Sequence, residues 1–453
     1  MCGFIAGPFR GDSFYTDGIE GMNYRGRQPA TSRSTSNFEI HHVRLPIQTP
    51  VGGHGAQPFT LPDGGAMAFC GEIFDPRIQE GKTTEEDLLN AIGQYPTARA
   101  SRLCQLDGFW SLVTVPSFNS RYMYVFTDHL GIKPVYYDGD SGVVCSEIVP
   151  LIRPGHPLDE IYLANCVKFG YDYSGRTAFE GISQMPPGSM LRIDASGMEP
   201  PELTVYWNWD LVPSCRSEDF PQLLTDAVKA RVLGYHNGGY NMSGLLLSGG
   251  LDSSIIYQIL VNEDILDEVH VFHTENGESE FLPAGVEILD TGEEVGLGHA
   301  VLSMQAPMDL GSLIPQTLLA EACECLHLDV VLTGDGADEV FGGYRRAKEY
   351  DSQASDVFCE LPYYHLPRLD RIHMRQTQEV RSPYLAPAVV KYGLELPYEE
   401  RTEKQALKAA ATILGVDPLI VNRPKHPLKS RQVLEGGIQH RVDLKEVFEY
   451  VYG

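Results

Sequence analysis

The sequence is short of positive charge. It has 35 Lys and Arg against 61 Asp and Glu, which gives a formal net charge of −26. Such a chain repels phosphate backbones and anionic lipid headgroups, so nucleic acid and membrane surfaces are excluded as general partners. Its basic residues nevertheless crowd the last quarter of the chain, where they form either an anion site or solvated helix faces: Arg345, Arg346, Lys404, Lys408, Arg423, Lys425, Lys429 and Arg431.

Long apolar runs and paired cysteines are also missing. No apolar stretch approaches the length of a membrane span, and no basic segment precedes an apolar one at the start, so we expect neither an anchor nor a secretory signal. The nine scattered cysteines favour a reducing cytoplasm over a disulfide framework. Cys323 and Cys325 have the wrong spacing for a zinc knuckle and are predicted to be core residues of a helix. A chain of 453 residues is expected to form roughly two or three domains.

A strand-to-helix turn in the middle of the chain carries the strongest local signal. The apolar run Leu245–Leu247 predicts a short buried strand that ends at a Ser-Gly-Gly turn, and apolar residues at helical spacing follow. Backbone N–H groups at such a helix N-terminus bind anions. Ser253 and Ser254 can add hydroxyl donors to a pyrophosphate. The Asp252 carboxylate would repel bare phosphate and therefore predicts a bridging Mg²⁺.

This turn lacks the Gly-Lys-Ser/Thr ending of a Walker loop. Its pattern, Ser-Gly-Gly-Leu-Asp-Ser-Ser, instead resembles the pyrophosphate-binding loop of ATP pyrophosphatases, enzymes that split ATP into AMP and pyrophosphate. The alternative is a plain strand, glycine turn and capped helix. The resemblance implies that ATP is bound by the residues of the turn: Leu247, Ser248, Gly249, Gly250, Asp252, Ser253 and Ser254.

A second acidic turn follows further along the chain. Strands are predicted at Val269–His273 and Leu326–Leu332, and the latter runs into Thr-Gly-Asp-Gly-Ala-Asp-Glu. Strands alternating with helices predict an α/β domain whose parallel sheet holds both turns at its carboxyl edge. A Gly-Asp-Gly sequence alone is merely a turn, but the pairing with the first loop suggests a shared Mg²⁺ site. The acidic residues expected at this site are Asp252, Asp335, Asp338 and Glu339.

The first half of the chain predicts a different architecture. Short alternating strands such as Phe109–Val115 and Tyr122–Phe126 lie between Gly and Pro turns, and helical sequence appears at Thr84–Gly93. This pattern predicts an α+β sandwich of antiparallel sheets. Cys2 directly follows Met1, and removal of Met1 would leave a free α-amine, with a pKa near 8, that can take the thiol proton. Taken alone, a cysteine at the second position is usually incidental.

A series of motifs changes that interpretation: Tyr24-Arg-Gly26, His42–Ile47, Gly55–Pro58, Phe69–Phe74, Leu106–Ser111, Asp128–Tyr137 and Ser146-Glu147. With Cys2, the series resembles the class II glutamine amidotransferase domain, a fold of the N-terminal nucleophile type. The resemblance implies that Cys2 attacks the side-chain amide of glutamine. It also implies that Arg44 holds the α-carboxylate of glutamine, that Glu85 holds its α-amine, and that Gly71 donates its N–H to the oxyanion.

One departure from that family lies beside the expected nucleophile. Cys70 stands where the family has an Asn whose side chain is the second oxyanion donor. Losing one such donor typically lowers the rate roughly 10²–10³-fold. The glutaminase is therefore expected to be slow, to borrow another donor, or to be vestigial.

Over nearly its whole length the chain resembles the asparagine synthetase family. The resemblance implies that Thr333 and Gly334 flank the AMP and that the backbone of Phe272 and His273 meets the adenine. The remaining implied residues of the synthetase site are Asp338 as a second Mg²⁺ ligand with Asp252, Lys404 as a contact of phosphate and of the acyl intermediate, and Asp335 as a catalytic carboxylate where the family has Glu.

These expectations divide the chain into a glutaminase half at residues 1–210 and a synthetase half at residues 211–453. The implied reaction forms an acyl-adenylate from ATP and a carboxylate, by default aspartate, and ammonia from glutamine then converts it to an amide. Asp335, the short segment Glu275–Val295, and Ala386 in place of a family Asp leave the acceptor open.

Two other classes of protein remain as alternatives. A ligase of the β-lactam synthetase or lasso-cyclase kind would join an amine other than ammonia and keep a weak or vestigial glutaminase. A catalytically inactive binding protein would be expected to lack the metal carboxylates. For every class the expected partners are small molecules in the cytoplasm, with a homodimer left open.

Overall fold

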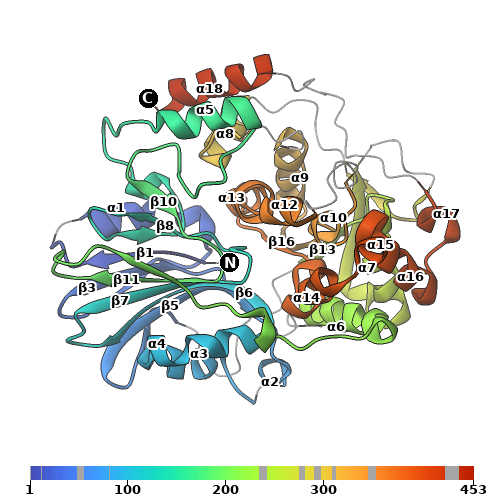
Figure 1. Cartoon of the computed structure of the whole chain (residues 1–453), viewed down its shortest axis with the longest axis horizontal. Helices are drawn as coiled ribbons and strands as arrows, with labels where there is room; N and C mark the ends of the chain where they lie inside the picture. Colours follow the sequence, from blue (N-terminus) through green and yellow to red (C-terminus); the bar gives the residue numbers. More distant parts are fainter. Residues whose placement is uncertain are drawn as a thin grey trace.

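Two kinds of sheet lie side by side in the molecule (Figure 1). The computed structural model describes residues 2–11, 13–47, 56–80, 82–233, 242–274, 281–289, 297–308, 313–344, 354–423 and 438–452. Antiparallel sheets of the first half lie at the left of Figure 1, and a parallel sheet of the second half lies at the right. The predicted fold class, an antiparallel sandwich followed by a parallel α/β domain, is confirmed.

The sandwich consists of two sheets whose strands are all paired antiparallel. The first has the order β10 (Ile182–Gln184), β8 (Tyr136–Asp138), β9 (Val144–Cys145), β1 (Gly3–Pro8), β3 (Phe38–Val43) and β2 (Thr31–Ser34). The second has the order β12 (Glu202–Val205), β11 (Ser189–Asp194), β7 (Tyr122–Thr127), β6 (Gly108–Ser117), β5 (Gly64–Ile73) and β4 (Phe59–Thr60). Phe4 and Ala6 of one sheet share a buried cluster with Ala68 and Val113 of the other, because alternate side chains of each strand point inward.

Helices cover the outer faces of this sandwich. Helix α1 (Phe14–Glu20) contacts β1 and β3, and α3 (Glu85–Gln94) contacts β5 and β6. Helix α3 begins after Thr84, whose hydroxyl accepts from the Asp87 N–H in a capping box, so the predicted helix is confirmed. The other helical segments here are η1 (Asn23–Arg25), α2 (Pro76–Gln79), α4 (Pro96–Arg99), η2 (Ala100–Gln105), η3 (Val149–Leu151) and α5 (Glu160–Phe169).

The sheet of the second half is parallel throughout. Its order is β15 (Glu287–Leu289), β14 (Val269–Thr274), β13 (Met242–Leu246), β16 (Leu328–Leu332) and β17 (Glu379–Arg381). The strands predicted near Leu245, Val269 and Leu332 are confirmed, and both acidic turns follow neighbouring strands at the same edge.

The helical segments of the second half are η4 (Trp209–Leu211), η5 (Ser217–Asp219), α6 (Phe220–Leu233), α7 (Leu251–Asn262), η6 (Leu266–Glu268), α8 (Leu297–Met304), α9 (Leu313–Cys325), α10 (Ala337–Val340), α12 (Ala354–Cys359), the π-helical η8 (Leu361–His365), α13 (Leu366–Arg375), η9 (Pro383–Leu385), α14 (Pro387–Glu395), α15 (Tyr398–Arg401), η10 (Thr402–Lys404), α16 (Gln405–Leu414), α17 (Pro418–Val421) and α18 (Ile438–Tyr452). In α9, Cys323 is buried as predicted. The same prediction for Cys325 is wrong, because this last residue of the helix is exposed.

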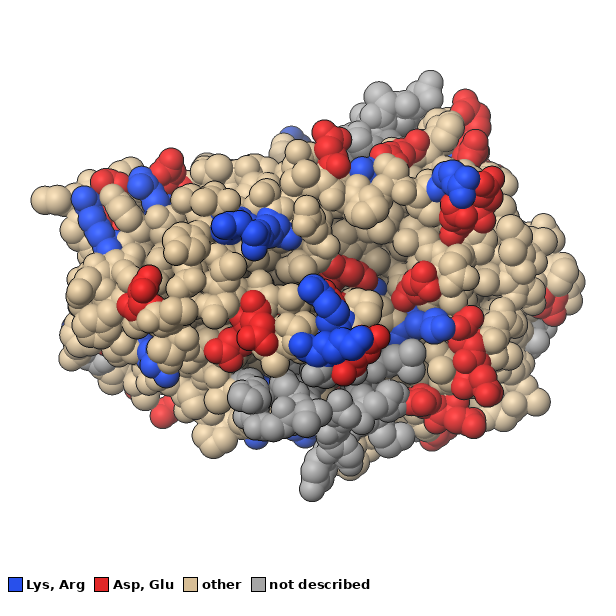
Figure 2. Space-filling view, turned by 90° about the horizontal axis from the view of Figure 1, so that it is seen from below, with Lys and Arg blue, Asp and Glu red and all other residues tan. Residues whose placement is uncertain are grey.

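A shared core joins the two halves. Helix α18 packs on α5 and α8 at the top of Figure 1. Ile5 and Tyr136 of the sandwich belong to the same buried cluster as Val301, Met304 and Phe448. In the parts of the chain described above, no helix has both the length and the apolarity needed to cross a membrane. On the face seen in Figure 2, acidic and basic side chains are interspersed.

Candidate active sites

The loop between β13 and α7 has the geometry of an anion site. Gly250 is the N-cap of α7 and provides no side-chain cap for the first N–H groups of that helix. Gly249 has φ +77°, which favours glycine. The hydroxyl of Ser253 lies 3.1 Å from the hydroxyl of Ser248 and accepts from the Ser248 N–H, so side-chain oxygens line the turn beside the helix end.

Two carboxylates from different turns converge on one lysine. Lys404 Nζ lies 2.6 Å from Asp252 Oδ2, at the start of α7, and 2.6 Å from Asp338 Oδ1, in α10. Burial lowers the pKa of the Lys404 ammonium, but the two carboxylates together outweigh this effect and raise the pKa above its usual value. A β-carbon on Gly343 would lie 1.9 Å from Asp338 Oδ1, so a side chain at this position would displace the Asp338 carboxylate.

The backbone around Lys404 is unusual. Glu403 and Lys404 have φ of 52° and 58°, in the left-handed region that most residues avoid. The Glu403 N–H donates to Gly342 O and the Lys404 N–H donates to Phe341 O, which fixes this strained turn against the end of α10. From this turn the Lys404 side chain reaches both carboxylates.

Two carboxylates of this site, Asp252 and Asp338, could hold a magnesium ion. Carboxylate oxygens are the ligands that Mg²⁺ prefers, and Asp252 and Asp338 lie within reach of one cation, since both bind the Lys404 ammonium. The expected participation of Asp335 and Glu339 in metal binding stays a prediction. Among the described residues no group of three or more His, Cys, Asp or Glu side chains is placed to hold a metal.

Those two acidic residues have partners of their own. Arg368 Nη2 donates to Asp335 Oδ1 at 2.6 Å, and the Tyr344 hydroxyl donates to Glu339 Oε1 at 2.6 Å. Asp335 precedes α10 whereas Asp338 and Glu339 are inside it, so the three side chains leave this turn in different directions.

The remaining predicted residues of this site lie at the same sheet edge. His273 Nδ1 is 2.8 Å from Leu247 O, and Phe272 and His273 are buried in β14, next to β13. The Thr333 N–H donates to Arg381 O of β17. A β-carbon on Gly334 would lie 2.8 Å from Asp252 Cβ, so the glycine lets the two acidic turns approach each other.

Two contacts of the loop are of special interest. The Tyr384 hydroxyl donates to Asp252 O at 2.7 Å, a contact that the sequence did not predict. Arg423 Nη2 donates to Gly249 O at 3.0 Å, which places one residue of the predicted basic cluster at the loop. Other members of that cluster lie outside the described residues: Arg345, Arg346, Lys425, Lys429 and Arg431.

Cys2 lies buried where the sandwich faces the second half. Burial raises the pKa of the Cys2 thiol to about 12, so the thiol needs a base to become a nucleophile near neutral pH. Its carbonyl oxygen accepts from Arg25 Nε at 3.2 Å and from the thiol of Cys70. The Cys70 side chain therefore contacts the backbone of Cys2, the expected nucleophile.

The other predicted glutamine-binding residues are Gly71 in β5, Glu85 at the start of α3, and Arg44 directly after β3. Gly71 has φ +139°, and a β-carbon there would lie 2.0 Å from Phe109 O, so only glycine permits this close pairing of β5 with β6. Glu85 Oε1 accepts from the Ile73 N–H at 3.1 Å. Burial raises the pKa of Glu85 to about 7, against the lowering effects of that hydrogen bond and of Arg44.

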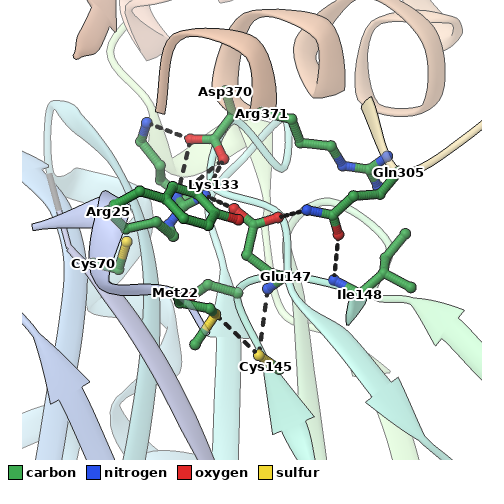
Figure 3. Close-up of polar contacts among 12 residues, drawn as sticks. Met22, Arg25, Cys70, Lys133, Cys145, Glu147, Ile148, Gln305, Asp370 and Arg371 are labelled. Atoms are coloured by element: carbon green, nitrogen blue, oxygen red, sulfur yellow. Dashed lines mark hydrogen bonds and ion pairs between the residues drawn. The ribbon is translucent and has the colours of Figure 1, made fainter. Parts of the chain in front are cut away.

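A buried polar cluster lies between the two halves, and sequence reasoning did not anticipate it. Arg25 of the sandwich bridges Glu147 and Asp370, and Lys133 Nζ donates to Asp370 Oδ1 at 2.9 Å (Figure 3). These four side chains are almost completely buried. Arg25, Lys133 and Glu147 each lie in a motif noted in the sequence, which was the only sequence evidence for this cluster. Their partner Asp370 belongs to no recognised motif.

A cavity lies between the two candidate sites. It has room for a molecule of the size of water. Asp370, at one side, contacts Arg25, and Ser382, another lining residue, donates its hydroxyl to Asp335 O. The lining is mainly apolar and consists of Phe109, Ile132, Lys133, Arg231, Leu366, Leu369, Asp370, Val380, Ser382 and Leu385.

Comparison with known proteins supports both halves of this description. Residues 1–207 match the family model of the glutamine amidotransferase domain, and residues 287–358 and 353–446 match that of asparagine synthase. The fold and the sites thus define a class: a glutamine amidotransferase domain joined to an asparagine synthase domain. The chain is similar to asparagine synthetases, to which it is 23–26% identical over the aligned residues.

Several relatives share this resemblance. A putative glutamine-hydrolysing asparagine synthetase of Mycobacterium tuberculosis is 26% identical over 352 residues, which cover 69% of this chain and 52% of that protein. Asparagine synthetase B of Escherichia coli is 23% identical, over 80% of this chain and 68% of that protein. The amidase chyE of Penicillium rubens is 25% identical, over 84% of this chain and 60% of that protein.

The chain spans about half the length of the first of these relatives. Among solved structures, glutamine phosphoribosylpyrophosphate amidotransferase of Bacillus subtilis has a TM-score of 0.34 at 14% identity, covering 74% of this chain and 81% of that one.

Proposed function

We propose that the chain is a glutamine-dependent ligase that uses ATP to adenylate a carboxylate, by default aspartate, and converts the adenylate to an amide with ammonia. The observation that carries this proposal is the convergence of Asp252 and Asp338, from two separate turns, on Lys404. A cation between two carboxylates beside a helix N-terminus is suited to a polyphosphate and its metal.

In the synthetase half, the loop after β13 binds the pyrophosphate part of ATP through the first N–H groups of α7 and the hydroxyls of Ser253 and Ser254. The backbone of Phe272 and His273, on the neighbouring strand, contacts the adenine, while Thr333 and Gly334 lie beside AMP. Mg²⁺ held by Asp252 and Asp338 would neutralise charge on the leaving pyrophosphate. Lys404 adds a second positive charge where negative charge develops as the acceptor carboxylate attacks the α-phosphorus.

In the glutaminase half, Cys2 attacks the amide carbon of glutamine. Removal of Met1 provides the α-amine that takes the thiol proton, which the buried thiol otherwise retains. Arg44 and Glu85 hold the α-carboxylate and α-amine of glutamine, and Gly71 donates to the oxyanion. Cys70 is a weak donor in the place of an amide, so we expect slow glutamine hydrolysis.

Ammonia then passes between the halves through the cavity. The lining is mainly apolar, which disfavours charging of ammonia to unreactive ammonium. The cavity lies between Asp370, which contacts the Arg25 partner of Cys2, and Ser382, which contacts Asp335. In this proposal Asp335 is the catalytic carboxylate, and Asp335 and its partner Arg368 meet the acceptor.

A second candidate is a ligase that joins an amine other than ammonia. Cys70 in the place of an amide donor favours it, since a weak glutaminase supplies little ammonia. Ala386 in place of an acidic residue also favours a different acceptor. The buried Cys2 beside Gly71 disfavours it, because such a ligase has no use for a glutaminase.

The test uses the full chain with ATP, Mg²⁺, amide-labelled ¹⁵N-glutamine and a panel of carboxylic acids, aspartate first. We expect AMP and pyrophosphate, and a product that gains the ¹⁵N label by mass spectrometry. A Cys2→Ala variant should keep synthesis from ammonium and lose synthesis from glutamine, while Cys166→Ala, a buried cysteine in α5, should keep both. Formation of ADP and orthophosphate would refute the adenylation mechanism.

A further inference from the structure

Helix α13 contacts both candidate sites from the synthetase half. Arg368 Nη2 lies 2.6 Å from Asp335 Oδ1 in the synthetase site, and Asp370 lies 3.0 Å from Arg25 beside Cys2. Residues two positions apart on an α-helix point about 200° apart, so α13 presents these two side chains on opposite faces. The helix therefore lies between the sites, with Leu366, Leu369 and Ile372 buried along it.

Arg25 connects Asp370 to the backbone of Cys2, the expected nucleophile. Both terminal nitrogens of Arg25 lie 3.0 Å from Asp370 Oδ2, and Arg25 Nε donates to Cys2 O at 3.2 Å. A β-carbon on Gly3 would lie 2.9 Å from Arg25 Cδ, so the arginine packs directly on the backbone after Cys2. Because guanidinium is planar, the direction of its terminal nitrogens fixes the direction in which Nε meets the Cys2 carbonyl.

The charges of this cluster are balanced. Arg25 and Lys133 are the cations, Glu147 and Asp370 are the anions, and Asp370 contacts both cations. Gln305 donates to Glu147 at 2.6 Å, so Glu147 is itself fixed (Figure 3). Asp370 is thus the member that joins Arg25 to Lys133, and it alone comes from α13.

We propose that Asp370 is a positioning residue of the glutaminase, contributed by the synthetase half: it holds Arg25 and thereby sets the place of Cys2. This inference rests on the proposed function and adds that the glutaminase site is incomplete without α13. On the opposite face of α13, Arg368 binds Asp335. A shift of α13 at the acceptor site therefore also moves Asp370 and, through Arg25, the backbone of Cys2.

The test compares Asp370→Asn with the wild type in two assays on the full chain. Glutamate release from glutamine measures the glutaminase, and AMP formation with ammonium measures the synthetase alone. We expect the kcat of glutamate release to fall by about 10–100-fold, because a displacement of about 1 Å in a reacting group can lower a rate 10²-fold. The KM for glutamine should stay within about twofold, since Arg44 and Glu85 are not touched, and the ammonium reaction should also stay within about twofold.

Two further variants separate positioning from general loss of structure. Asp370→Asn combined with Lys133→Met keeps one cation, Arg25, and one anion, Glu147, and should show the same loss of kcat although its charge is balanced. Tyr136→Phe removes both hydrogen bonds from Arg371 of the same helix to the Tyr136 hydroxyl of the sandwich and leaves Arg25 untouched, so it should keep wild-type glutamate release.

Glutamate release within twofold of wild type in both Asp370 variants would overturn the inference. So would an equal fall in the ammonium reaction, or an equal effect of Tyr136→Phe, since each would mean that the interface acts only as a structural support. A wild-type chain that releases no glutamate, or forms no AMP, would instead refute the proposed function, so the two failures are distinct.

Discussion

Replacing Lys404 with Met tests the centre of the synthetase site. The change keeps the unbranched stem of the side chain up to the ε-carbon and removes the ammonium that lies 2.6 Å from both Asp252 and Asp338. Each charge-assisted hydrogen bond stabilises by about 1.5–3 kcal/mol, and the side chain of Lys404 is only 8% exposed, so the loss of both bonds should lower the free energy of unfolding by about 3 kcal/mol. The two carboxylates would then face each other without a cation.

Added Mg²⁺ should restore part of this stability, because Asp252 and Asp338 can share a divalent cation in place of the ammonium. The gain in melting temperature on adding Mg²⁺ should therefore be larger in the variant than in the wild type. If Lys404 stabilises the departing pyrophosphate by a similar amount, about 3 kcal/mol, AMP formation should fall about 150-fold.

Thermal unfolding with and without Mg²⁺ measures the first effect. Pyrophosphate release with ammonium as the nitrogen donor measures the second and is independent of the glutaminase. Lys408→Met, one helical turn further along, is the matched control and should change neither quantity. An unchanged melting temperature together with an unchanged rate would refute our account of this cluster, and so would an equal gain from Mg²⁺ in variant and wild type.

Three other predictions follow from the geometry. The pKa of Glu85, raised to about 7 by burial, means that its carboxylate forms as pH rises through 7, so the KM for glutamine should fall between about pH 6 and pH 8. Glu85→Gln should raise this KM and remove the pH dependence, and a KM that stays flat with pH in the wild type would contradict the role of Glu85. Cys70→Asn should restore an amide donor and raise the kcat of glutamine hydrolysis by up to about 10²-fold; a kcat no higher than that of the wild type would exclude residue 70 as a donor. Gly343→Ala would place a methyl group 1.9 Å from Asp338 Oδ1 and should abolish ammonium-dependent AMP formation while glutamate release continues. Gly298→Ala, whose new methyl group meets nothing within 4 Å, is its control, and equal AMP formation by both variants would count against the Asp338 site.

The acceptor pocket is the part of the proposal that these variants leave open. Asp335 is paired with Arg368, and the two residues lie at the synthetase end of the cavity, near Ser382. A shorter carboxylate than the family's Glu leaves more space at this point. The panel of carboxylic acids described above therefore decides between aspartate and a larger or differently charged acceptor.

The sequence by itself determined the local elements and their order. A run of apolar residues followed by Ser-Gly-Gly predicts a strand, a turn and a helix because these depend on neighbours along the chain, and β13, α7 and α3 confirm such predictions. The order of strands and helices likewise determined an antiparallel sandwich before a parallel sheet. The division near residue 210 remains a prediction.

Only the tertiary structure decided which side chains meet. It brought Asp252 and Asp338 to Lys404 and gave Asp335 and Glu339 other partners. It also placed Asp370 against Arg25, 345 positions away along the chain. The contact of Asp370 with Arg25 depends on packing between distant elements, and a buried charge is stable only when a partner reaches it, so no local pattern could have identified Asp370 as that partner.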